Sequence, residues 1–299
     1  MSRRTLHFVL LAAAVVLLCA ADVVMGSVDI SLREVWEALR GRGDETVRYI
    51  ILHFRLPKAA VALLAGAALS ASGLQMQTLF RNPLAGPYVL GVSSGAGLGV
   101  ALFLLGLPLL GSSSGGQLRR NVGVVGAAWA GSALILAAVT AVTARIKDIM
   151  VVLILGMMFG SVAGAFVEML QYFSSESALK SFVIWTMGSL GGVTAGQLAI
   201  MAVVVAAGLS LSVLSIKPLN ALLLGENYAR SMGVDIGRSR MIIFVSTILL
   251  AGTVTAFCGP IGFVGLAVPH VARMLFAEAD HRVLMPASML TGRDRKSVV

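Results

Sequence analysis

The sequence predicts an all-α membrane protein with several membrane-spanning helices, and three observations support this prediction. The chain of 299 residues is 58% hydrophobic and only 12% charged, whereas a soluble domain carries about a quarter charged residues. Apolar runs of 18 residues or more recur along the chain, and ~20 helical residues cross a ~30 Å hydrocarbon core. The 33 glycines suit close packing of helices in lipid.

Eight apolar segments are candidate spans within one transmembrane domain, residues 1–292. They cover about 7–26, 58–80, 88–110, 121–144, 149–171, 193–214, 240–257 and 260–277. The break Cys258-Gly259-Pro260 interrupts helix continuity, so the last segment is expected to be re-entrant or short. The first segment lacks a small-x-small cleavage site and is interpreted as a retained span. A further span begins after Pro286, and the charged residues 293–299 are interpreted as a non-native or frameshifted tail.

Lysine and arginine are slightly more numerous in the loops on the N-terminal side, which favours a cytoplasmic N-terminus. Loop 27–57 is then outside and loop 215–240 is in the cytoplasm. Ser31 and Glu34 form a capping-box pattern, so a short helix is expected near 31–39 on the outer surface. The net charge of +9 fits loops that face anionic lipid and does not call for nucleic acid.

The segment from Gly66 to Gly99 is rich in small residues and contains a rigid turn at 81–87. It lacks the GxxxxGK[ST] pattern of a phosphate-binding loop. Close helix packing is the favoured interpretation, and a lining of a substrate pathway is the alternative. Gln77, Asn82 and Pro83 are the candidate residues for either role. In lipid, Gln77 must bond to a neighbouring helix or face water.

Nothing in the sequence predicts catalysis, a metal site or a bound cofactor. The four histidines have no metal-ligand spacing, and Cys19 and Cys258 lie far apart in apolar segments. No Ser/His/Asp or Cys/His arrangement is present. Glu168 lies near the outer end of the fifth predicted span, and it is either solvated or part of a proton relay. The chain is therefore expected not to be an enzyme.

The polar segment 215–240 predicts a short amphipathic helix between two apolar runs. Asn220 is expected to cap a helix over 221–232, which Gly233 would end. Glu226 and Arg230 would pair four residues apart. Gly225 weakens the middle of this helix by about 1 kcal/mol, so it is expected to divide it into two short helices. The helix could lie in the lipid interface or dock into a groove on a soluble protein.

Seven blocks together resemble the FecCD/BtuC-type permease subunits of ABC importers for iron-siderophores, haem and cobalamin. They are Arg55-Leu-Pro-Lys58; Gly66–Gly73 with Gln77; Arg81-Asn-Pro-Leu-Ala85 with Pro87; Leu90–Ala96; Trp185–Leu190; Leu224–Ala229 with Met232–Val234; and Gly259–His270 with Arg273 and Asp280-His-Arg282. The resemblance implies a homodimer with ten helices per subunit, of which about eight are present here. It also implies multi-pass location in a bacterial inner membrane.

The resemblance assigns roles to particular residues. The helix that couples to a cytoplasmic ATPase dimer would comprise Leu224, Gly225, Glu226, Ala229, Met232 and Gly233. A periplasmic or lipoprotein substrate-binding protein would dock at Arg55 and Lys58. Thr143, Ala144 and Arg145 match the position of an inner gate. ATP and Mg²⁺ would be bound by the ATPase and not by this chain. The competing interpretations are an ion-coupled secondary transporter and a truncated, non-functional fragment.

Overall fold

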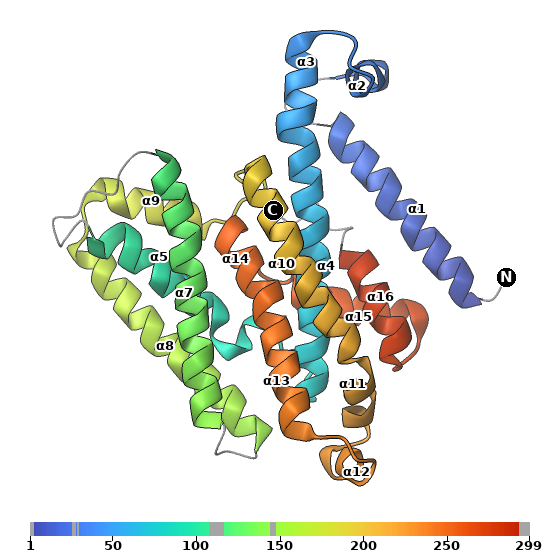
Figure 1. Cartoon of the computed structure of the whole chain (residues 1–299), viewed down its shortest axis with the longest axis vertical. Coiled ribbons are helices and arrows are strands. Elements are labelled where there is room, and N and C mark those ends of the chain that lie inside the picture. The colour runs from blue at the N-terminus through green and yellow to red at the C-terminus, as the bar shows by residue number, and fades with distance from the viewer. Residues whose placement is uncertain (1–2, 26–27, 29, 108–116, 144–147, 293–299) are drawn as a thin grey trace.

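The computed structural model of the chain describes residues 3–25, 28, 30–107, 117–143 and 148–292. All regular secondary structure within these residues is helical (Figure 1). Six of the described helices are long and apolar enough to cross a membrane, and the helices over 92–106 and 264–276 are apolar but shorter. The prediction of a polytopic, all-α membrane protein is therefore confirmed.

The helices follow one another in the order of the predicted spans, with short helices in the loops. The first half contains α1 (Arg3–Val24), α2 (Leu32–Leu39), α3 (Glu45–Ile50), η1 (Ile51–Arg55), α4 (Leu56–Leu79), η2 (Pro87–Leu90), α5 (Val92–Ala101), η3 (Leu102–Gly106) and α7 (Gln117–Thr143). The second half contains α8 (Ile149–Phe173), α9 (Glu176–Thr186), α10 (Ala195–Leu214), α11 (Ile216–Leu223), α12 (Glu226–Ser231), α13 (Ile236–Thr247), η4 (Ile248–Gly252), α14 (Thr253–Cys258), α15 (Val264–Phe276) and α16 (His281–Thr291).

Two π-helical turns, η1 and η4, join neighbouring α-helices into longer rods, and a third, η3, extends α5. Residues 45–79 and 236–258 therefore each form one continuous helix. The predicted span 260–277 is instead a non-helical stretch followed by α15, whose 13 residues rise only about 20 Å. The break at Gly259, which has a φ of 76°, accounts for this short helix.

α4 lies at the centre of the fold and packs against α10, α13, α15 and α16 (Figure 1). Small residues let the helices approach closely. A Cβ placed on Gly73 would lie 1.7 Å from the carbonyl oxygen of Gly265 in α15, so no larger residue fits there. Gln75 is fully buried; its amide donates to Ser215 and accepts from Ser246, which links α4 to the end of α10 and to α13. Polar groups at the centre of the bundle therefore hold helices together.

A second group of helices, α5, α7 and α8, packs beside this central bundle (Figure 1). In the most apolar stretch of α8, only 17% of the residues are buried inside the protein, whereas 78% are buried in the corresponding stretch of the helix over 45–79. The short helices lie at the two ends of the molecule, with α2, α3 and α9 at one end and α12 at the opposite end (Figure 1). We call these the α9 end and the α12 end. Residues 293–299 lie outside the described part of the chain.

Candidate coupling segment and the sites at the two ends

The predicted coupling region consists of two short helices, α11 and α12, joined at Gly225. The prediction of one helix over 221–232 capped by Asn220 is wrong, because α11 already begins at Ile216 and contains Asn220. Pro218 in the first turn of α11 is compatible with this earlier start, since that turn needs no backbone N–H from it. Gly225 divides the helices with φ 115° and ψ 152°, a conformation that essentially only glycine adopts.

Three apolar side chains on and beside α12 are exposed. Leu224 at the end of α11, Tyr228 within α12 and Met232 at the end of α12 are 64%, 51% and 52% exposed. Ala229 is fully buried and packs α12 against the fold. Gly233 follows the helix with a φ of 80°, which ends it as predicted. We call Leu224, Tyr228 and Met232 the α12 stripe.

Glu226 forms its ion pair with Arg240 and not with Arg230, which corrects the predicted pairing within the helix. Its side chain is 31% exposed and that of Arg240 is 12% exposed. The pair forms because α13 returns directly beside α12 and brings Arg240 to the protein-facing side of Glu226. Arg230 is exposed. The ion pair therefore fixes α12 on α13 and leaves the stripe free to contact another molecule.

A groove of about 560 Å³ separates α12 from the first residues of α8, lined among others by Arg81, Asp148, Leu222 and Tyr228. Arg81 closes one side of it, because its guanidinium donates to the carbonyl oxygen of Leu222 at 3.4 Å. A Cβ on Gly225 would lie 2.9 Å from Nη2 of Arg81. The loop after α4 thus contacts the turn between α11 and α12 directly.

The candidate pathway residues lie where α4 meets its neighbours. The Gln77 amide donates to the carbonyl of Leu266 at 3.0 Å and accepts from Arg273 at 2.6 Å, so it joins α4 to α15. Asn82 forms a local turn by accepting from the N–H of Leu84 at 2.9 Å. Pro83 follows it on the exposed surface. These contacts favour the packing interpretation for Gln77 and a turn-forming role for Asn82.

Arg55 is not placed where a docking residue is expected. It is only 9% exposed, and its guanidinium donates to the carbonyl oxygens of Val23 at 2.7 Å and Val24 at 2.6 Å, and to that of Val28. The reason is that Arg55 lies inside the continuous helix over 45–79, on the side that faces the end of α1. It satisfies carbonyls that the helix end leaves without partners. Lys58, one turn further along, is exposed.

The predicted gate is only partly described. Thr143 is the last residue of α7, and its side chain lies outside the described part of the structure. Ala144 and Arg145 lie outside the described residues. Glu168 is exposed on α8. Within the described part of the chain, no group of three or more His, Cys, Asp or Glu residues could hold a metal ion.

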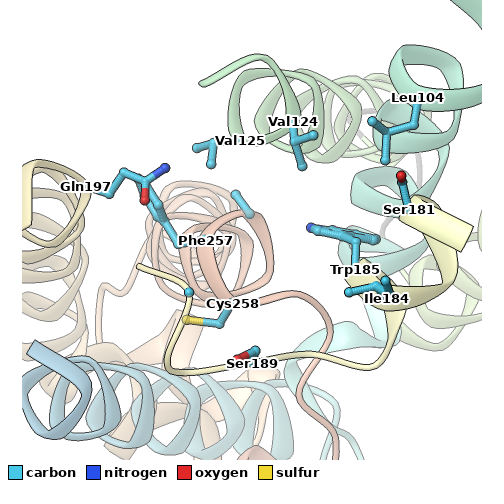
Figure 2. Close-up of a pocket in the computed structure, with 12 residues that line it drawn as sticks. Leu104, Val124, Val125, Ser181, Ile184, Trp185, Ser189, Gln197, Phe257 and Cys258 are labelled. Carbon is cyan, nitrogen blue, oxygen red and sulfur yellow. The ribbon is translucent and has the colours of Figure 1, made fainter. Parts of the chain in front are cut away.

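A cavity of about 420 Å³ lies at the α9 end, between α7, α9 and α14 (Figure 2). Val124 and Leu104 form part of its apolar wall, and Trp185 faces Phe257 and Gln197 across it (Figure 2). The indole N–H of Trp185 is buried and has no hydrogen-bond partner among the described residues. The described residues of the lining include no carboxylate, and they suit recognition by shape and apolar contact.

The family profile described as the FecCD transport family matches residues 12–293. The chain belongs to the FecCD transport family. It is 34% identical over 293 residues to the hemin transport system permease protein HmuU of Yersinia pestis, covering 97% of this chain and 84% of the relative. It is 35% identical over 288 residues to the vitamin B12 import system permease protein BtuC of Citrobacter koseri, covering 96% of this chain and 81% of that protein.

Two solved structures resemble the FecCD chain. One, described as an inward-facing metal-chelate type ABC transporter, superposes with a TM-score of 0.83 at 29% identity and covers 97% of this chain and 87% of its own. The other, PsaBC of Streptococcus pneumoniae in complex with Fab, has a TM-score of 0.56 at 19% identity, covers 83% of this chain and 82% of its own, and supports the fold alone. These likenesses confirm the resemblance read from the motifs. They do not favour an ion-coupled secondary transporter.

Three contacts of the coupling segment in this FecCD chain were not predicted from sequence. They are made by Arg81, Arg240 and His281, which reach Leu222, Glu226 and Asn220 respectively. Arg81 and His281 belong to sequence motifs shared with the family, and these motifs could have marked both residues as important. No sequence feature of Arg240 other than its charge pointed to its contact with Glu226.

Proposed function

We propose that the chain is the membrane permease of an ABC importer that moves a haem, cobalamin or ferric-siderophore chelate into a bacterial cell. Membership of the FecCD transport family supports this proposal, as do the hemin and vitamin B12 transport names of the relatives. Those names describe the relatives, so we propose only the class of chelate that this chain carries and not a particular compound. The energy for transport comes from ATP hydrolysed on a separate cytoplasmic ATPase dimer.

The exposed α12 stripe is the observation that carries this proposal. Leu224, Tyr228 and Met232 are exposed apolar side chains on and beside a short helix at one end of the membrane helices. The helix is held from behind by buried Ala229 and by the Glu226–Arg240 pair. Exposed apolar side chains on a braced short helix fit a groove on a soluble protein. Here the ATPase dimer supplies that groove.

Coupling then works as a shift between two conformations of the permease. The ATPase has different affinities for the two positions of α12 when it is open and when nucleotide closes it. A ligand with a different affinity for each state shifts the population between them. Movement of α12 therefore opens the substrate path to one side of the membrane or to the other.

The remaining partners follow from the same proposal. A second copy of the chain completes the substrate path, which runs between the two subunits in the inner membrane. A periplasmic or lipoprotein substrate-binding protein delivers the chelate at the α9 end, where Lys58 is exposed. ATP and Mg²⁺ are bound by the ATPase, and the permease carries out no covalent chemistry.

Uptake by reconstituted vesicles tests the proposal. Vesicles that contain this chain, the partner ATPase and ATP on the cytoplasmic side should accumulate labelled haem or cobalamin when the binding protein is present. Vesicles without ATP, or with an ATPase that binds but does not hydrolyse ATP, are the matched controls and should show none. Uptake that follows an ion gradient and ignores ATP would contradict the proposed function.

A further inference from the structure

Asn220 makes three side-chain contacts that join the coupling segment to the start of α16. Although it lies within α11, its side chain turns to the start of α16. Its Oδ1 accepts from the backbone N–H of His281 at 2.9 Å and lies 2.7 Å from Nδ1 of the same residue. Its Nδ2 donates to Oδ1 of Asp280 at 2.6 Å. One amide therefore ties α11 to two successive residues at the N-terminus of α16.

The contacts allow only one arrangement of hydrogens when the ring of His281 is neutral. The Asp280 carboxylate can only accept, so it fixes the NH₂ group of Asn220 toward itself and the amide oxygen toward His281. Nδ1 of His281 must then carry the ring hydrogen and donate it. Nε2, left as an acceptor, lies 2.8 Å from the hydroxyl of Thr78 in α4. That hydroxyl hydrogen is shared with the carbonyl of Leu74.

The contact with α4 is deep in the protein. His281 is 1% exposed and Thr78 is 4% exposed. A hydrogen bond between buried groups is costly to break, because neither partner regains water. α4 in turn packs against four other helices of the central bundle. The chain of contacts thus runs from α11, directly before the turn at Gly225, to the element with the widest contacts in the fold.

We propose that Thr78, Asn220, Asp280 and His281 form a polar clasp that positions the coupling segment and transmits the movement of α12 to α4. The transmission rests on the proposed function, since it needs an ATPase acting on α12. The clasp itself is a structural contact and does not. α11 is too short to bend between Asn220 and Gly225, so a push on α12 reaches the clasp through a rigid turn of helix. The residues of the clasp are positioning residues, because none of them contacts the substrate or ATP.

Another connection, the Glu226–Arg240 pair, links α12 to α13 but differs in strength. Its two side chains remain 31% and 12% exposed, and partly exposed ion pairs contribute little and are screened by salt. The clasp is exposed at Asp280, but its contact with α4 is buried, because His281 and Thr78 are only 1% and 4% exposed. The clasp is therefore the contact whose loss should separate ATP hydrolysis from transport.

The test uses an isosteric pair of variants in the assembled importer. Thr78→Val removes the hydroxyl and keeps the side-chain shape, whereas Thr78→Ser keeps the hydroxyl. Asn220→Ala opens the clasp at its α11 side. ATP hydrolysis and chelate uptake are measured in the same vesicles. Thr78→Val and Asn220→Ala should retain ATP hydrolysis and lose about fivefold or more in chelate imported per ATP. Thr78→Ser should keep the wild-type ratio.

If Thr78→Val leaves the amount of chelate imported per ATP unchanged, the proposed transmission is wrong. A parallel fall of uptake and ATP hydrolysis also leaves this ratio unchanged, indicates less folded protein, and counts against the transmission in the same way. Absence of ATP-driven uptake by the wild type would instead refute the proposed function. Hydrogen exchange on the purified chain tests whether the clasp exists, independently of transport. Asn220→Ala should speed exchange of the α11 amides about tenfold and leave those of α8 unchanged. Equal exchange of α11 in variant and wild type would overturn the clasp.

Discussion

The two polar segments of the chain, 31–58 at the α9 end and 215–240 at the α12 end, look alike in sequence but present different surfaces. Both contain short helices, and both were assigned a docking role. At the α12 end, the exposed stripe is apolar and the charged pair Glu226–Arg240 faces the protein. At the α9 end, Arg55 is buried against α1, and Lys58 is left as the exposed cation of its motif.

This difference teaches that the charge of a loop does not identify its contact surface. An arginine can serve as an internal clamp for a helix end, as Arg55 does, because its five donors satisfy several carbonyls at once. Apolar side chains can be the exposed, binding part of a polar loop when the polar ones are used to brace it.

The largest effect is expected from Arg55→Ala. This change leaves three carbonyls near the end of α1 without their charged donor, and hydrogen bonds to charged groups contribute about 1.5–3 kcal/mol each. We expect a loss of about 3 kcal/mol in the free energy of unfolding, seen as a lower melting temperature in detergent. Lys58→Ala is the matched control and should melt as the wild type does. A normal melting temperature for Arg55→Ala would show that Arg55 does not act as an internal clamp for the end of α1.

The next effect concerns the α12 stripe. Tyr228→Asp places a charge in the α12 stripe and should weaken binding of the ATPase about 30-fold, since central interface residues contribute about 2 kcal/mol or more. Affinity is measured by titrating the ATPase onto the permease in lipid nanodiscs. Arg230→Asp adds the same group at an exposed position of α12 outside the stripe and should change the affinity far less. Equal losses in the two variants would show that the stripe is not the contact surface.

A pH effect of intermediate size is expected at the polar clasp. His281 lies at the first residue of α16, outside the six helices that qualify as spans. Burial, together with the charge of Arg273, lowers the pKa of His281 to about 4 from the ordinary 6.5. Below pH 6.5 the opened state gains a proton that the closed state does not hold, so the clasp loses stability as the pH falls from 6.5 towards 4.

At pH 5.5 this loss is about 1.4 kcal/mol, or about a tenfold rise in opening of the contact. Hydrogen exchange of the α11 amides at pH 5.5 and 7.5, corrected for the intrinsic pH dependence, measures it. His281→Gln has no titrating ring and should show no such rise. The same pH response in both proteins would exclude His281 as its source.

The smallest effect is expected at Lys58. Lys58→Glu should weaken docking of the substrate-binding protein about threefold to tenfold and reduce the salt dependence of its association rate, because an exposed charge acts mainly on encounter. Lys217→Glu, an exposed lysine in the coupling segment, is the matched control and should leave docking unchanged. If neither substitution changes docking, Lys58 is not part of the interface with the substrate-binding protein.

The fold class was predictable because hydropathy and helix length depend only on local composition. The break at Gly259 and the division at Gly225 were also readable, since glycine adopts backbone conformations that other residues do not. The side-chain contacts were not. Asn220 has the residue type of a helix cap, and only the position of α16 shows that its amide is used there instead.

The same limit explains Arg55 and Glu226. Whether an arginine faces water or a neighbouring helix end depends on where α1 stops in space, which no local pattern records. The partner of Glu226 was expected four residues away on the same helix, but tertiary packing offered Arg240 from α13. Contacts between distant segments decide which polar residues brace a site and which side chains remain to form its surface.

In the proposed mechanism, the energy for transport enters this chain at the turn between α11 and α12. Gly225→Ala tests it most directly, because a Cβ there is strained at φ 115° and would meet Arg81 at 2.9 Å. Gly237→Ala, at an ordinary φ with its nearest neighbour at 3.4 Å, is the control. The measurement is chelate imported per ATP hydrolysed in reconstituted vesicles. We predict about a tenfold fall for Gly225→Ala and none for Gly237→Ala; a wild-type ratio for Gly225→Ala would contradict the claim.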